Sequence, residues 1–116
     1  QSHFIYEVTP NLFLNPHEFD SEVKGLISEA LKMSPDAIGK ASIAMSKRKD
    51  HTGFVSEEST DFTCIQGAED SIVSAEQMRQ SLEGTKVNYI EMEEAGHMAH
   101  FEVPDKLEAL IGSFLK

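Results

Sequence analysis

Apolar residues recur at helical spacing through the first third of the chain. The stretch SHFIYEV (residues 2–8) is interpreted as the end of a helix, and TPNLFLNP as a connection punctuated by proline and asparagine. From about His17 to Lys32 the pattern predicts an amphipathic helix with acidic residues on its other faces. Its apolar positions are Phe19, Val23, Leu26, Ile27, Ala30 and Leu31.

A second helix is predicted to begin at SPDA. Ser34 is a good N-cap, Pro35 suits the first helical position, and Asp36 favours the positive end of the helix dipole. Apolar residues continue at helical spacing until a basic run ends the helix. DHTGF interrupts this pattern, and a short helical turn, VSEES, is expected after it. The apolar positions are Ile38, Ala41 and Met45, and the basic run is Lys47, Arg48 and Lys49.

The second half of the chain alternates between strand and helix patterns. DFTCIQG and KVNYIEM are typical of strands, and SAEQMRQSLEG between them is a helix with Ser74 as N-cap and Gly84 as its stop. VPDKLEALIGSFLK predicts a last helix, with Pro104 in its first turn. A crossover helix makes the two strands parallel, and such sheets need helices on both faces and further strands alongside. The predicted fold class is therefore α/β, with two parallel strands, about four to five helices and an incomplete sheet.

Composition sets limits on these expectations. The 116 residues suit one small domain, and 40% hydrophobic with 26% charged residues is typical of a globular chain. The formal net charge of −10 argues against nucleic acid and anionic membranes as partners. The single cysteine, Cys64, excludes an internal disulfide and favours a reducing compartment, and its strand setting favours a structural thiol. A cytoplasmic protein is expected.

Two loops carry the candidate chemistry. Asp70 follows the first predicted strand and His97 follows the second. Loops after parallel strands lie at the same edge of a sheet, and neighbouring strands are about 4.8 Å apart, so these side chains can meet there. A carboxylate that orients a histidine makes a general base. Gly67 and Gly96 are expected to let the backbone turn sharply before each loop.

Other residues offer alternatives to this pair. Glu69 can replace Asp70 as the acid, and either Ser71 or Ser74 can be imagined as a nucleophile, although Ser74 already serves as a cap. The spacing of His97, His100 and Glu102 invites a metal site, but a loop position without further ligands argues against one. We expect His100 to line a pocket beside His97 or to face solvent. Met98 and Phe101 suit loop packing or contact with an acyl group.

Taken together, these motifs resemble the end of the α/β-hydrolase fold. The resemblance rests on the stretches Gly67-Ala68-Glu69-Asp70, Ala95-Gly96-His97 and Glu102-Val103-Pro104. It extends upstream: residues 42–74 are similar to the family's helix, short turn and penultimate strand, and residues 4–13 with the helix after them to part of its lid. The resemblance implies that residues 1–33 are a partial lid and residues 34–116 the C-terminal part of the core.

This resemblance implies a Ser-His-Asp triad, which needs no metal or cofactor. Asp70 matches the acid and His97 the base, whereas the nucleophile comes earlier in the family's chain order, in a G-x-S-x-G turn. No such turn occurs in this sequence, and the oxyanion-hole residues also belong to the earlier half. We therefore expect a C-terminal fragment of an esterase-like hydrolase of small acyl esters, inactive by itself. Thioesterases, lactonases, C–C hydrolases and dehalogenases share this half of the fold.

Two other functions stay open. The chain can be a free-standing interaction module that kept the hydrolase shape, or one half of a split enzyme. For the hydrolase fragment as for the interaction module, the strand edge and the sheet faces need cover, so a homo-oligomer, or association with the missing half, is expected.

Overall fold

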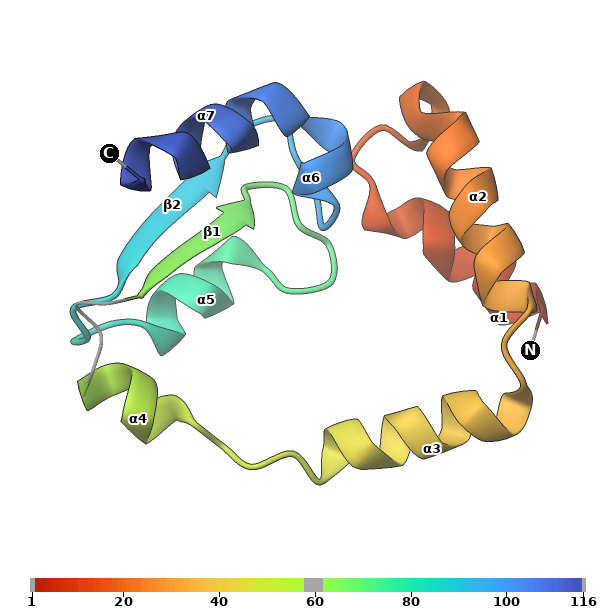
Figure 1. Cartoon of the computed structure of the whole chain (residues 1–116), viewed down its shortest axis with the longest axis horizontal. Coiled ribbons are helices and arrows are strands. Elements are labelled where there is room, and N and C mark those ends of the chain that lie inside the picture. Colours follow the sequence, from red (N-terminus) through yellow and green to blue (C-terminus); the bar gives the residue numbers. More distant parts are fainter. Residues whose placement is uncertain (1, 58–61, 116) are drawn as a thin grey trace.

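A computed structural model describes residues 2–57 and 62–115 of the chain (Figure 1). Seven α-helices, two 3-10 helices and two strands are formed by these residues. In chain order the elements are α1 (Ser2–Val8), η1 (Thr9–Leu12), η2 (Pro16–Phe19), α2 (Asp20–Leu31), α3 (Pro35–Ser46), α4 (Thr52–Glu57), β1 (Thr63–Gly67), α5 (Ala75–Ser81), β2 (Asn88–Met92), α6 (Ala99–Glu102) and α7 (Pro104–Phe114).

The mixed α/β arrangement is confirmed. β1 and β2 pair in parallel, with Thr63 opposite Asn88 and Gly67 opposite Met92, and α5 forms the crossover between them. Figure 1 shows α5 and α7 on opposite sides of the two strands. The seven α-helices of the described residues exceed the four to five expected, because residues 52–57 form a full helix and the chain after His97 winds into α6.

Helix ends follow the local sequence closely. Ser34 and Ser74 each adopt the extended backbone of an N-cap and accept hydrogen bonds from the amides of Ala37 and Gln77, both at 3.1 Å. α5 ends at Ser81, three residues before Gly84, which takes the left-handed φ of +80°. The helix expected over residues 17–32 is divided into η2 and α2. Part of the expected helical turn VSEES and of the strand DFTCIQG lies outside the described residues.

The N-terminal helices have a small core of their own. Ile5, Phe13, Val23 and Ile27 are buried together, and Phe13 stacks on Phe19 with ring centroids 5.5 Å apart. Other apolar side chains pack against this cluster, among them Leu12, Leu26, Ala30 and Met98. Met98 belongs to the loop after β2, so the N-terminal core reaches the loop that carries His97. Whether these residues form a lid stays a prediction; Phe13 is a core residue, whereas Leu14 is 38% exposed.

α3 and α4 lie apart from the sheet (Figure 1). Neither helix contains a buried residue, and Ile43, Met45 and Phe54 are more than half exposed. The chain exposes 8460 Å² of surface, whereas about 6300 Å² is typical of a compact monomer of its mass. Its radius of gyration is 16.3 Å, against about 13 Å for a compact domain of this length. The fold therefore leaves an unusual amount of apolar surface uncovered.

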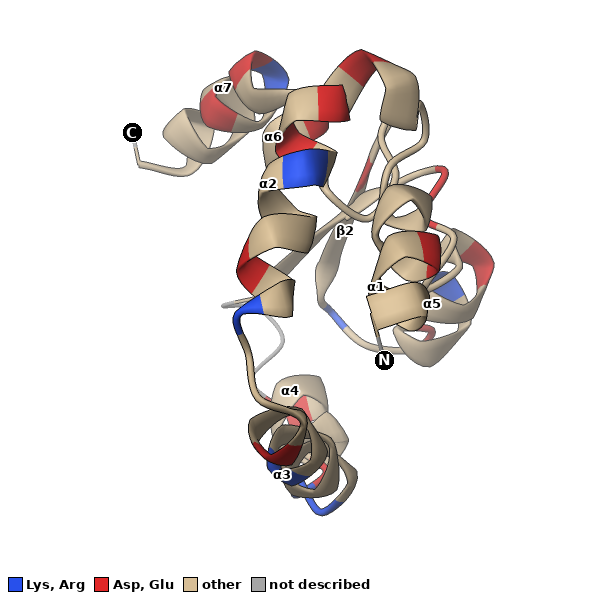
Figure 2. Cartoon of the chain, turned by 90° about the vertical axis from the view of Figure 1, so that its right-hand side faces the viewer, with Lys and Arg blue, Asp and Glu red and all other residues tan. Residues whose placement is uncertain are grey.

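Acidic residues are spread over several helices and outnumber basic ones (Figure 2). Within residues 2–57 and 62–115, no helix is both long enough and apolar enough to cross a membrane.

Candidate functional site

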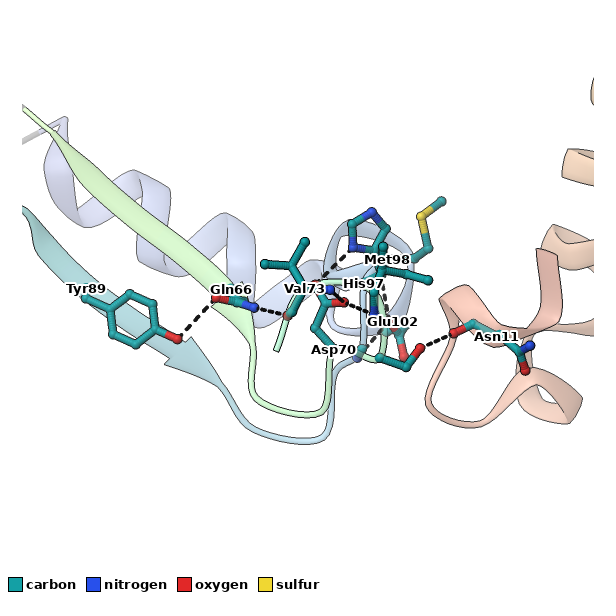
Figure 3. Close-up of polar contacts among 11 residues, drawn as sticks. Asn11, Gln66, Asp70, Val73, Tyr89, His97, Met98 and Glu102 are labelled. Atoms are coloured by element: carbon teal, nitrogen blue, oxygen red, sulfur yellow. Dashed lines mark hydrogen bonds and ion pairs between the residues drawn. The ribbon is translucent and has the colours of Figure 1, made fainter. Parts of the chain in front are cut away.

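Asp70 lies in the turn that follows β1, with its side chain only 7% exposed. Its Oδ1 atom accepts hydrogen bonds from the backbone amides of Ile72, at 2.8 Å, and Val73, at 3.0 Å. This pattern is an Asx-type turn, in which the carboxylate holds its own loop. The second oxygen, Oδ2, stays available and lies 2.9 Å from Nδ1 of His97 (Figure 3).

These contacts keep Asp70 ionised. Burial disfavours the charged carboxylate, but hydrogen bonds from the Val73 amide, the His97 ring and the Ile72 amide outweigh it, so the pKa of Asp70 lies below its usual value. An ionised carboxylate can only accept hydrogen bonds, so the proton between the two residues belongs to Nδ1 of His97. This arrangement fixes one tautomer of the ring.

His97 lies in the loop that follows β2, and its side chain is 37% exposed. Its backbone amide donates to the carbonyl of Leu12 at 2.9 Å, so the N-terminal segment supports the position of the histidine. With Nδ1 donating to Asp70, the Nε2 atom of the ring is left as an acceptor. The meeting of Asp70 and His97 that the sequence predicts is therefore confirmed, whereas their catalytic role stays a prediction.

The two loops are bound directly to each other. The amide of Ala68 donates to the carbonyl of Met92, and the amide of Glu69 to the carbonyl of Ala95, both at 2.9 Å. A Cβ atom on Gly67 would lie 1.9 Å from the carbonyl oxygen of Gly96, so only glycine fits there. A turn does begin at Gly67, whose carbonyl accepts from the amide of Asp70 at 3.2 Å. Glycine is required there by the close approach of the loops and not by a positive φ, which among the described glycines only Gly84 has.

A pocket of about 340 Å³ lies beside the pair. It touches four successive residues of β1 and also reaches Met78 of α5 and Leu107 of α7. Successive strand residues point to opposite faces of a sheet. A pocket that touches all four of these residues and a helix on each side of the sheet therefore follows the edge of β1 rather than one face. That edge has no strand partner among the described residues. The lining comprises Cys64, Ile65, Gln66, Gly67, Asp70, Val73, Met78, His97, Ala99, His100 and Leu107.

The alternative residues take other roles in the structure. Glu69 is exposed, and Asp70 is the acid that contacts His97. The Ser71 hydroxyl donates to the carbonyl of Asn11 at 2.6 Å, and Ser74 caps α5. Each hydroxyl thus forms its hydrogen bond with a partner other than His97.

The remaining candidates are placed as follows. His100 lines the same pocket as His97, which was one of the two positions expected for it. Phe101 lies against Phe13, with ring centroids 6.3 Å apart, which is packing. Among the described residues no group of three or more His, Cys, Asp or Glu side chains could hold a metal ion. Cys64 is half-buried in β1, and burial raises the pKa of its thiol.

Two polar residues that hold the site were not predicted to do so. Glu102 accepts hydrogen bonds from backbone amides on both sides of His97, and Gln66 donates from its side chain to the carbonyl of Val73 at the end of the Asp70 loop. Only Gln66 left a weak signal in the sequence, as a polar residue in a largely apolar strand. Glu102 lies in α6, a four-residue helix that the sequence did not predict.

No protein-family model matches the chain, and a search among curated proteins finds no match either.

Proposed function

We propose that this chain is the C-terminal part of an α/β-hydrolase that cleaves small acyl esters. Asp70 is the acid and His97 the base of its triad, and the nucleophile belongs to residues outside this sequence. The observation that carries the proposal is the 2.9 Å contact between Oδ2 of Asp70 and Nδ1 of His97. It leaves Nε2 as the acceptor that a general base needs.

The chemistry assigns one task to each residue. Nε2 of His97 takes the proton of a serine hydroxyl as the serine oxygen attacks the ester carbonyl, and then gives that proton to the departing alcohol. Water attacks the acyl-enzyme in the same way and releases the acid. Asp70 keeps Nδ1 protonated and stabilises the imidazolium that forms twice in the cycle.

The open edge of β1 supports this assignment. Parallel sheets are stable when further strands and helices bury both faces, and the pocket along β1 has the position that a neighbouring strand would take. Such a strand would end at the same sheet edge as Asp70 and His97, where open α/β sheets bind ligands. The uncovered surface of α3 and α4 is consistent with the same missing part. We place the protein in the cytoplasm, because its single cysteine suits a reducing compartment.

The test begins with the coding DNA upstream of the codon for Gln1. We expect an in-frame segment of roughly 100 or more residues that carries G-x-S-x-G after a strand. The complete protein should release p-nitrophenol from p-nitrophenyl butyrate. His97→Ala should lower kcat by a factor on the order of 10⁶, and Asp70→Asn by a factor on the order of 10⁴.

The control variant is His51→Ala, since His51 is exposed and lies outside the site. It should leave kcat unchanged, and the 116-residue chain by itself should release no product above buffer. Near-normal turnover of His97→Ala would refute the role of the histidine. Turnover by the isolated chain would instead place the nucleophile within these residues.

A second candidate is a partner-dependent protein without its own chemistry, either an interaction module or half of a split enzyme. The observation that favours it is the excess of about 2000 Å² of exposed surface over a compact monomer of this mass. An area of that size exceeds the roughly 800 Å² that one chain buries in an interface of standard size and falls in the range of obligate assemblies. A start codon directly upstream of Gln1, with a complex in light scattering, would favour this candidate over a hydrolase fragment.

A further inference from the structure

The carboxylate of Glu102 binds three backbone amides from two distant parts of the chain. Its Oε1 atom accepts from Gly96 at 2.9 Å and from Met98 at 3.0 Å. Its Oε2 atom accepts from Leu14 at 3.0 Å. Hydrogen bonds that involve an ionised group are about twice as strong as neutral ones, so three on one carboxylate make a firm anchor.

The position of these amides matters more than their number. Gly96 and Met98 are the neighbours of His97 in the chain, so Glu102 holds the backbone immediately before and after the histidine. Holding both flanking peptide units restricts the direction in which the imidazole leaves the backbone. Nδ1 can meet Oδ2 of Asp70 only within a narrow range of such directions, because a hydrogen bond weakens steeply away from linearity.

The third amide ties this anchor to the N-terminal helices. Leu14 belongs to a segment, residues 11–14, that contacts both loops of the site. Within it, the carbonyl of Asn11 accepts from the Ser71 hydroxyl at 2.6 Å, and the carbonyl of Leu12 accepts from the amide of His97 at 2.9 Å. Figure 3 shows Asp70, His97 and Glu102 gathered between the strands and the segment that contains Asn11.

We propose that Glu102 is the positioning residue of the Asp70–His97 pair and couples that pair to the N-terminal segment 11–14. The inference deepens the proposed function and rests on it only for the claim that the pair takes part in catalysis. The geometry of the pair itself can be measured without any turnover. A movement of the N-terminal helices would reach His97 through Leu12 and through the Leu14–Glu102 contact. Formation of the pair and the position of these helices are therefore linked.

The experiment compares two substitutions of Glu102 in the 116-residue chain. Ring ¹⁵N shifts of His97, recorded at a pH where its imidazole is neutral, report the fraction of the Nδ1–H tautomer that pairing with Asp70 selects. Amide hydrogen exchange reports the three backbone contacts. Asp70→Ala supplies the unpaired reference spectrum, and Glu83→Gln, at an exposed glutamate, is the control for loss of one charge.

The two variants have different expected outcomes. Glu102→Ala should shift the tautomer of His97 toward that of Asp70→Ala and speed exchange at Gly96, Met98 and Leu14 about tenfold or more. Glu102→Gln keeps one carbonyl oxygen for Gly96 and Met98 but presents an NH₂ group to the Leu14 amide. Only Leu14 should then exchange about tenfold faster, with the tautomer kept.

The proposal is overturned if Glu102→Ala folds and keeps the wild-type tautomer. If Glu102→Ala does not fold, Glu102→Gln becomes the test. Amide exchange at Leu14 that is as slow in Glu102→Gln as in the wild type overturns the proposal. If the protein is not a hydrolase, the spectra should still change as predicted. If Glu102 does not position His97, the complete protein should still be active in the esterase assay.

Discussion

Nδ1 of His97 lies 2.9 Å from Oδ2 of Asp70, although the two residues are 27 positions apart in the chain. The contact depends on three features together: a parallel strand pair in register, two loops hydrogen-bonded to each other, and an Asx-type turn that leaves one oxygen of Asp70 available. Each feature has a consequence that a single substitution can measure.

Gly67→Ala should be severely destabilising. Its methyl group would lie 1.9 Å from the carbonyl oxygen of Gly96, and backbone on both sides must move to make room. We expect a loss of about 3 kcal/mol or more in the free energy of unfolding, measured with urea. Gly25→Ala is the matched control, because nothing lies within 4 Å of a Cβ atom there, and it should add about 0.5–1 kcal/mol by stabilising α2. Equal stability of Gly67→Ala and the wild type would contradict the close approach of the loops.

The ionisation of Asp70 makes stability depend on pH. Its folded pKa is lower than the unfolded value near 3.8, so its contribution to stability is complete above about pH 4–5 and is lost as the pH falls through the lower folded value. Asp70→Asn should therefore be less stable than the wild type at pH 7, and the difference should shrink below pH 3.8. Urea unfolding of both proteins from pH 7 to pH 2 measures this. A difference that stays constant with pH would show that the charge of Asp70 contributes nothing.

The two serine caps should behave differently. Ser74→Ala removes a hydrogen bond from α5, the crossover helix of the sheet, and should cost about 1 kcal/mol of global stability. Ser34→Ala removes the same kind of bond from α3, which buries no residue, so it should speed amide exchange within α3 and leave global unfolding nearly unchanged. Equal losses of global stability would mean that α3 unfolds together with the sheet.

Phe13 joins the N-terminal core to the loop of His97. It is 5% exposed, stacks on Phe19 and lies against Phe101, so Phe13→Ala should cost about 3–5 kcal/mol. Ile43→Ala, at a residue 56% exposed on α3, should change stability by less than about 0.5 kcal/mol. Thermal unfolding followed by circular dichroism compares the two. A small effect of Phe13→Ala would mean that the N-terminal helices are not folded cooperatively with the rest.

Local patterns in the sequence predicted the elements and the pair, for identifiable reasons. Ser34, Ser74 and Pro104 act on their own backbone neighbourhood, so their effects can be read without the fold. The meeting of Asp70 and His97 could also be expected, because a strand–helix–strand unit brings the ends of its two strands to one edge.

The alternation of strand and helix could be predicted from local patterns, and so could the two loops that carry Asp70 and His97. The tertiary structure decided how those loops are held. Gly67 is required by a carbonyl 29 positions away, at Gly96, and Glu102 binds Leu14, 88 positions away, and neither distance is visible in a local pattern. It also decided that α3, despite its apolar positions, remains exposed. Periodicity determines which face of a helix can be buried, but burial requires a surface to pack against, and only the folded chain decides whether one is there.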